Sequence, residues 1–188
     1  YENDGKELKD YQSTLSQGWT VRLKSRDYYF RPSVSWPKIS SGNFSARYYP
    51  QGFIFDVAGC CYFPAVGPEA KTIISYLNST VAKKFLEILS PTLNFEIEQV
   101  KKLPYIKPND GVRSDIEQFY SISIDDWNIE ETSWSFLAIP FLSTLQPSTS
   151  LKSSWGAWSE HINFTCSKMK QLEEENNRYW INAFALQG

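Results

Sequence analysis

Histidine and cysteine are scarce in this chain of 188 residues, which limits the catalytic chemistry it can support. His161 is the only histidine, and the three cysteines are the adjacent Cys60 and Cys61 and the distant Cys166. These residues provide no set of zinc ligands, and a Ser-His-Asp triad would have to use His161, which lies near no nucleophile motif. Three cysteines, an odd number, also do not indicate a framework of disulfides, so we expect a reducing, cytoplasmic compartment.

Other absences narrow the function further. The sequence has no glycine-rich phosphate loop, no apolar run long enough to span a membrane and no signal peptide. It begins at a tyrosine, Tyr1, and we therefore expect a segment of a longer protein. The acidic pairs Asp125–Asp126 and Glu130–Glu131 are interpreted as solvated faces or helix caps rather than as metal ligands or hydrolytic groups.

The chain is rich in aromatic residues, and its charges are strongly separated. Aromatic residues make up 16% of the chain, whereas the net charge is only −2. Residues 19–47 hold six basic residues and one acid, and residues 114–151 hold six acids and no lysine or arginine. Such a chain can hold a phosphate backbone with one part and keep it away from the other. We interpret three tryptophans as packing anchors rather than base-stacking platforms: Trp36, Trp127 and Trp134.

The first third of the chain is predicted to be rich in β-structure. Short strands are expected where β-branched and aromatic residues cluster between turn residues, at 18–24, 28–31, 34–36, 44–49 and 52–57. Residues 40–43 form a turn, and Gly59 closes the last strand. A small β-rich lobe over residues 18–66 follows from this pattern.

Helical periodicity begins after this lobe. Apolar residues recur every three or four positions from 70 to 89, which predicts one amphipathic helix that Pro91 ends. A short helix is expected before Pro104 and another at 115–122, whereas 127–145 fits no clear pattern. Residues 146–150 are expected to be a flexible linker.

A long amphipathic helix is predicted from Leu151 to the end of the chain. The predicted fold class is therefore α+β, with a small β-rich recognition lobe followed by helices and a long C-terminal amphipathic helix. We divide the chain into a target-recognition-like domain at 1–107, with helices at 70–104 after the lobe, and a mostly helical tail or spacer at 108–188.

Four blocks of sequence occur in an order that resembles a known family. They are residues 35–48 (SWPKISSGNFSARY) with 52–56 (GFIFD), 76–79 (YLNS) with 89–104 (LSPTLNFEIEQVKKLP), 126–136 (DWNIEETSWSF), and 172–178 (LEEENNR) with 183–187 (AFALQ). Together they resemble the C-terminal half of the PglX-type adenine-specific DNA methyltransferases of BREX phage-defence systems. The chain is similar, more loosely, to type IIG restriction-modification proteins. The resemblance covers residues 18–188.

The resemblance implies a role without catalysis. In that family an upstream methyltransferase domain carries an Asn-Pro-Pro-Tyr motif for the flipped adenine and a glycine-rich loop for S-adenosylmethionine, and neither motif occurs here. These residues would then be the DNA target-recognition module of a site-specific adenine methyltransferase, with no catalytic, cofactor-binding or metal residue of their own. The implied partners are double-stranded DNA, the upstream domain and other subunits of a defence system, and no membrane.

A recognition module must grip the duplex before a base can be flipped. Basic and hydroxyl side chains hold phosphates, while Arg, Asn, Gln and Lys reach base edges. We expect a DNA-facing loop and flank at Lys38, Ser40, Ser41, Asn43 and Arg47, and phosphate contacts at Arg22, Lys24 and Arg26. A solvated surface position is the alternative for each of these residues alone.

Two other functions stay open at this point. A protein-interaction module would use the aromatic and acidic residues 114–145 to dock partner subunits of a defence complex. A self-sufficient enzyme would need a pocket that gathers His161 with aspartate or glutamate. Duplex binding that weakens with salt discriminates the recognition module from the interaction module. The sequence does not specify the DNA site, a fused nuclease, the choice between BREX and type IIG, or the oligomeric state.

Overall fold

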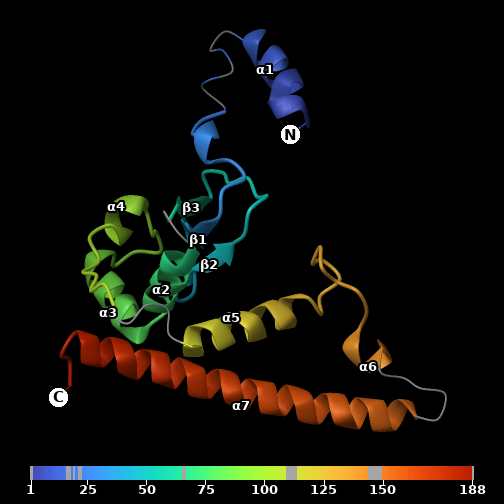
Figure 1. Ribbon diagram of the computed structural model, residues 1–188. Coiled ribbons are helices and arrows are strands. Elements are labelled where there is room, and N and C mark those ends of the chain that lie inside the picture. Colours follow the sequence, from blue (N-terminus) through green and yellow to red (C-terminus); the bar gives the residue numbers. More distant parts are fainter. Residues whose placement is uncertain are drawn as a thin grey trace.

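A small antiparallel sheet followed by helices makes this an α+β structure, as the sequence predicts (Figure 1). The computed structural model describes residues 2–15, 18, 20, 23–64, 67–108, 114–143 and 150–187. The described elements are η1 (Glu2–Gly5), α1 (Lys6–Ser13), η3 (Arg26–Tyr28), β1 (Ser33–Pro37), β2 (Arg47–Tyr49), β3 (Gly59–Tyr62), α2 (Gly67–Leu77), α3 (Thr80–Leu89), α4 (Ile97–Val100), α5 (Ser114–Trp127), α6 (Pro140–Ser143) and α7 (Leu151–Ala183). None of the helices in these ranges is long and apolar enough to cross a membrane.

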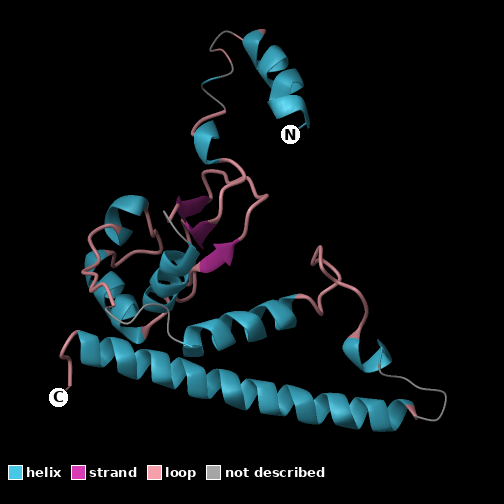
Figure 2. Cartoon of the chain, viewed as in Figure 1, coloured by secondary structure: helices cyan, strands magenta, loops and turns pink. Residues whose placement is uncertain are grey.

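The sheet has three strands in the order β2-β1-β3. Figure 2 shows the strands in magenta. Strand β1 lies in the middle of this order. Its alternate apolar residues, Val34 and Trp36, are buried on one face. Val34 lies opposite Tyr48 in β2 and Tyr62 in β3. The predicted strand at 34–36 is therefore confirmed, and the strand predicted at 44–49 is confirmed only for β2.

Two strand predictions are wrong. Residues 28–31 end a 3-10 helix and enter a turn, where Phe30 has a φ of 64°, a left-handed conformation that no strand tolerates. Residues 52–57 form no strand, and Gly59 begins β3 rather than closing a strand. Within the strand predicted at 18–24, residues 19, 21 and 22 lie outside the described residues, and the four that are described, Gly18, Thr20, Leu23 and Lys24, lie in no strand.

The single helix predicted from 70 to 89 is two helices, α2 and α3, with a break at Asn78 and Ser79. Ser79 is the N-cap of α3, and its hydroxyl accepts a hydrogen bond from Ala82 N at 3.2 Å. The Asn78 side chain turns to the backbone of Ala46, with which it forms two hydrogen bonds. The apolar period continues across the break because both helices pack on the same core.

Helix α7 has 33 residues and, at 1.5 Å per residue, a length of about 50 Å. It runs along one side of the whole molecule (Figure 1) and contacts α3 near its C-terminal end and α5 and α6 nearer its N-terminal end. Trp180 of α7 belongs to the same buried cluster as Val34 and Leu86. The core therefore crosses residue 107, the expected domain boundary, and the division into two domains stays a prediction.

The three tryptophans interpreted as packing anchors have different environments. Trp36 is buried, and its Nε1 donates a hydrogen bond to Phe95 O at 2.8 Å, as an anchor should. Trp127 is 57% exposed and Trp134 is 86% exposed, so the packing interpretation is wrong for both. Trp134 stacks on Phe53 with ring centroids 5.3 Å apart, which leaves most of the indole in contact with solvent.

Candidate nucleic-acid interface

Arg47 lies on the face of the sheet that points away from the core. Side chains alternate along a strand, and Tyr48, its neighbour in β2, packs against the core cluster. Arg47 lies opposite Ser35 in β1, which in turn lies opposite Cys61 in β3. We call this row, Arg47, Ser35 and Cys61, the outer row. The small side chains of Ser35 and Cys61 leave the long side chain of Arg47 exposed, so that its guanidinium group is accessible to a large polyanion.

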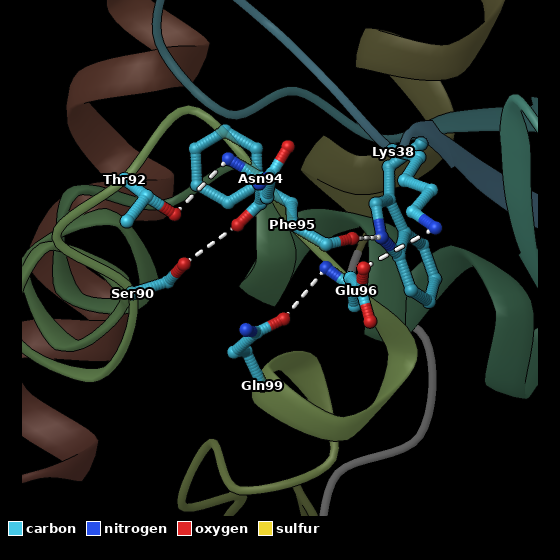
Figure 3. A network of polar contacts seen from close by, with 8 residues as sticks. Lys38, Ser90, Thr92, Asn94, Phe95, Glu96 and Gln99 are labelled. Carbon is cyan, nitrogen blue, oxygen red and sulfur yellow. Dashed lines mark hydrogen bonds and ion pairs between the residues drawn. The ribbon is translucent and has the colours of Figure 1, made fainter.

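The β1–β2 loop, residues 38–46, follows directly from this sheet and is held by backbone hydrogen bonds. Ser40 N donates to Leu93 O at 3.0 Å, and Phe95 N donates to Lys38 O at 2.7 Å. Ile39 and Asn94 form an isolated antiparallel bridge between these two bonds. Figure 3 shows the segment after α3 turning back beside Lys38. The loop is thus fixed at its start, where the sequence predicts a DNA-facing surface.

The five predicted residues of the loop and its flank differ in how free their side chains are. Ser41, Asn43 and Arg47 are exposed, and no hydrogen bond or ion pair with another described residue engages their side chains. The Ser40 hydroxyl accepts from Gly42 N at 3.2 Å and therefore stabilises the turn itself. Lys38 forms an ion pair with Glu96, with Nζ and Oε1 3.2 Å apart (Figure 3).

Two of the other predicted contacts, Lys24 and Arg26, come before β1 in the chain. Lys38 follows this strand, and a five-residue strand is about 13 Å long. Arg26 lies 3.7 Å from the carboxylate of Asp4, which also accepts a hydrogen bond from Lys9. This hydrogen bond, the charge of Lys9 and then that of Arg26 lower the pKa of Asp4. Lys24 is exposed, and Arg22 lies outside the described residues.

One basic residue near the loop is absent from the sequence-based prediction. Lys83 of α3 lines a surface hollow of about 260 Å³ together with Asn43 from the loop and Leu93 from the segment after α3. Glu87, one turn further along α3, lines the same hollow and reduces its positive charge. No local signal in the sequence indicates this position, because only tertiary packing brings α3 beside the loop.

A second hollow of about 330 Å³ lies between α5 and α7 and gathers His161 with Asp125 and Asp126. This grouping is the one that a self-sufficient enzyme would need. Within the described ranges, however, no hydrogen bond joins the imidazole to either carboxylate, and the ring stacks on Trp158 with centroids 5.4 Å apart. The same ranges contain no group of three or more His, Cys, Asp or Glu side chains that could hold a metal ion.

The chain is similar in sequence to known proteins of one kind, adenine-specific methyltransferases. No family model matches the chain. It is 35% identical over 176 residues to the adenine-specific methyltransferase PglX of Lacticaseibacillus casei (strain Zhang), and the match covers 89% of the chain and 15% of that protein. It is 36% identical over 138 residues to the adenine-specific methyltransferase BrxX of Escherichia coli O9:H4 (strain HS), covering 72% of the chain and 11% of that protein.

The chain is homologous to one segment of these two methyltransferases. The resemblance to PglX-type proteins is confirmed to this extent. The chain spans 15% of the length of the first relative and 11% of the second. A role of the segment in target recognition stays a prediction.

Proposed function

We propose that this chain is the DNA target-recognition module of a PglX-type adenine-specific DNA methyltransferase and has no catalytic centre of its own. The observation that carries the proposal is the exposed Arg47 in the outer row, beside a backbone-anchored loop that presents Ser41 and Asn43 to solvent. Homology to adenine-specific methyltransferases supplies the reason to expect DNA as the ligand.

The residues divide into two roles in this proposal. Arg47 binds a phosphate, because a guanidinium forms charge-assisted hydrogen bonds with phosphate oxygens in two directions. Asn43 reads a base edge, since its amide can donate and accept at the same time. Lys38 contributes less than its charge suggests, because a phosphate must compete with Glu96 for it.

S-adenosylmethionine belongs to the parent enzyme in this proposal. The residues of this chain do not fit the cofactor, because neither of the two hollows described above is lined by a glycine-rich loop at the end of a strand. The chain therefore finds and holds the site, and the upstream domain, the other proposed partner, performs the methyl transfer.

Duplex binding at several salt concentrations tests the proposal. We expect Arg47→Gln to reduce the slope of log K against log[salt] by about one and the affinity about ten-fold, as loss of one phosphate contact should. Lys170→Gln is the matched control, because Lys170 is an exposed cation on α7 far from the loop in the sequence. Equal effects of the two substitutions would show that the binding is diffuse and would refute a DNA-binding outer row.

Selection from a random duplex pool tests the reading of sequence. We expect the chain to enrich one shared motif, and Asn43→Ala to relax the preference at one position of it. Binding without enrichment would leave a phosphate-binding surface but contradict target recognition.

A further inference from the structure

The hollow between α5 and α7 is lined by residues of both helices, by Ile129 just beyond α5 and by Pro140 at the start of α6. Its residues on the α5 side are Ile122, Asp125, Asp126 and Ile129. The first three share one face of α5, and Ile129 lies in the turn that follows the end of the helix at Trp127. The two isoleucines are half-buried, whereas the two aspartates are exposed. This side of the hollow is therefore an apolar wall with an acidic rim.

The residues on the α7 side have the spacing i, i+3, i+4, i+7, which places them on one helical face. They are Trp158, His161, Ile162 and Thr165. The same stripe of α7 continues to Leu172 and Trp180, which are 2% and 1% exposed because α7 there packs against the rest of the core. From Trp158 to Thr165 the stripe is covered only in part. A helical stripe of this kind requires a partner along its full length to bury its apolar residues.

Charge distinguishes the partners that could complete this surface. Residues 114–151 hold six acids and no lysine or arginine. Asp125 and Asp126 form no ion pair with any other residue in the described ranges. Two adjacent uncompensated carboxylates beside an apolar wall attract cationic side chains and repel acidic ones.

We propose that the groove between α5 and α7 binds a basic amphipathic helix of a partner protein. Its apolar residues, spaced i, i+3, i+4, i+7, pack on Ile122, Ile129, Trp158 and Ile162, as in other helix-in-groove complexes. Its lysines or arginines pair with Asp125 and Asp126. The site lies on α5 and α7 rather than on the outer row, so it does not depend on the proposed function in DNA recognition.

A labelled synthetic helix tests this binding site. The probe is an amphipathic peptide of about 14 residues, roughly 21 Å long when helical, with leucines on one face and lysines beside them. Binding to the 188-residue chain is measured by fluorescence anisotropy. We expect micromolar binding that Asp125→Asn with Asp126→Asn weakens about five-fold. Glu130→Gln with Glu131→Gln is the matched control, because it removes equal charge just outside the groove and should leave the affinity unchanged.

A second variant distinguishes apolar packing in the groove from charge attraction. Ile162→Ala should weaken binding even at high salt, where the carboxylates are screened. Circular dichroism of each variant establishes that α7 is intact. Absence of binding at low salt, equal binding of a peptide with glutamate in place of lysine, or equal losses in the two double variants would each overturn the proposal. Concentration-dependent self-association abolished by Ile162→Ala would also overturn it, because the occupant would then be a second copy of the chain.

Discussion

Asn78 connects the break between α2 and α3 to the β1–β2 loop. Its Oδ1 accepts a hydrogen bond from Ala46 N at 2.8 Å, and its Nδ2 donates to Ala46 O at 2.9 Å. Ala46 is buried, so Asn78→Ala leaves two backbone groups without partners or nearby water. At about 1–3 kcal/mol for each buried group left unpaired, we expect the free energy of unfolding to fall by about 2–6 kcal/mol.

Urea denaturation followed by tryptophan fluorescence measures this loss. Asn78→Asp keeps the acceptor for Ala46 N but lacks the donor. We therefore expect it to lower the free energy of unfolding as well, because the Ala46 carbonyl is left unpaired. Asn163→Ala is the control, because Asn163 is exposed on α7 and its substitution should change stability by no more than about 0.5 kcal/mol. A comparably small effect of Asn78→Ala would refute the inference that this side chain holds the end of the loop.

Two further predictions concern the core. Trp180→Ala should lower the free energy of unfolding by about 3–5 kcal/mol, because the ring is buried among other aromatic residues. Trp155→Ala, at a position 56% exposed, should cost less than about 1 kcal/mol in the same denaturation experiment. Burial raises the pKa of Tyr76 to about 12, so the folded state keeps a proton that the unfolded chain loses near its ordinary value of 10. Tyr76 therefore makes a stability contribution that is complete below pH 10 and is lost as the pH rises toward 12. Denaturation at pH 9 to 11 should show a smaller decline in Tyr76→Phe than in the natural chain, and equal declines would contradict this assignment.

The sequence predicts those strands and helices whose apolar residues recur with the period of the element itself. Alternation around Val34 locates β1, and the apolar stripe locates α7. The alternating aromatics Phe53 and Phe55 mislead, because their rings pack on other aromatic residues although their backbone joins no strand. The break at Asn78 could not be predicted either, since it depends on a hydrogen-bonding partner 32 residues away in the chain.

The candidate interface was predictable to a similar degree. Polar and basic residues in a loop or at its flank, such as Asn43 and Arg47, are expected to be exposed, and they are. Pairing of Lys38 with Glu96 could not be predicted, because it joins residues that only the folded chain brings together. The position of Lys83 beside the loop depends in the same way on tertiary packing.

Arg47 and the acidic helix α5 lie on different sides of the sheet. Tyr48 contacts Tyr120 of α5, with ring centroids 5.5 Å apart, so the acidic helix lies on the core side, whereas Arg47 faces outward. Packed layers are about 10 Å apart, and the Debye length in physiological salt is about 8 Å. Carboxylates on α5 should therefore repel a polyanion at the outer row only weakly at physiological salt. At an ionic strength of about 0.01 M the Debye length is about 30 Å, and the repulsion then reaches across the sheet. The proposed phosphate-binding face and the proposed groove for a basic helix are therefore compatible in one short chain at physiological salt.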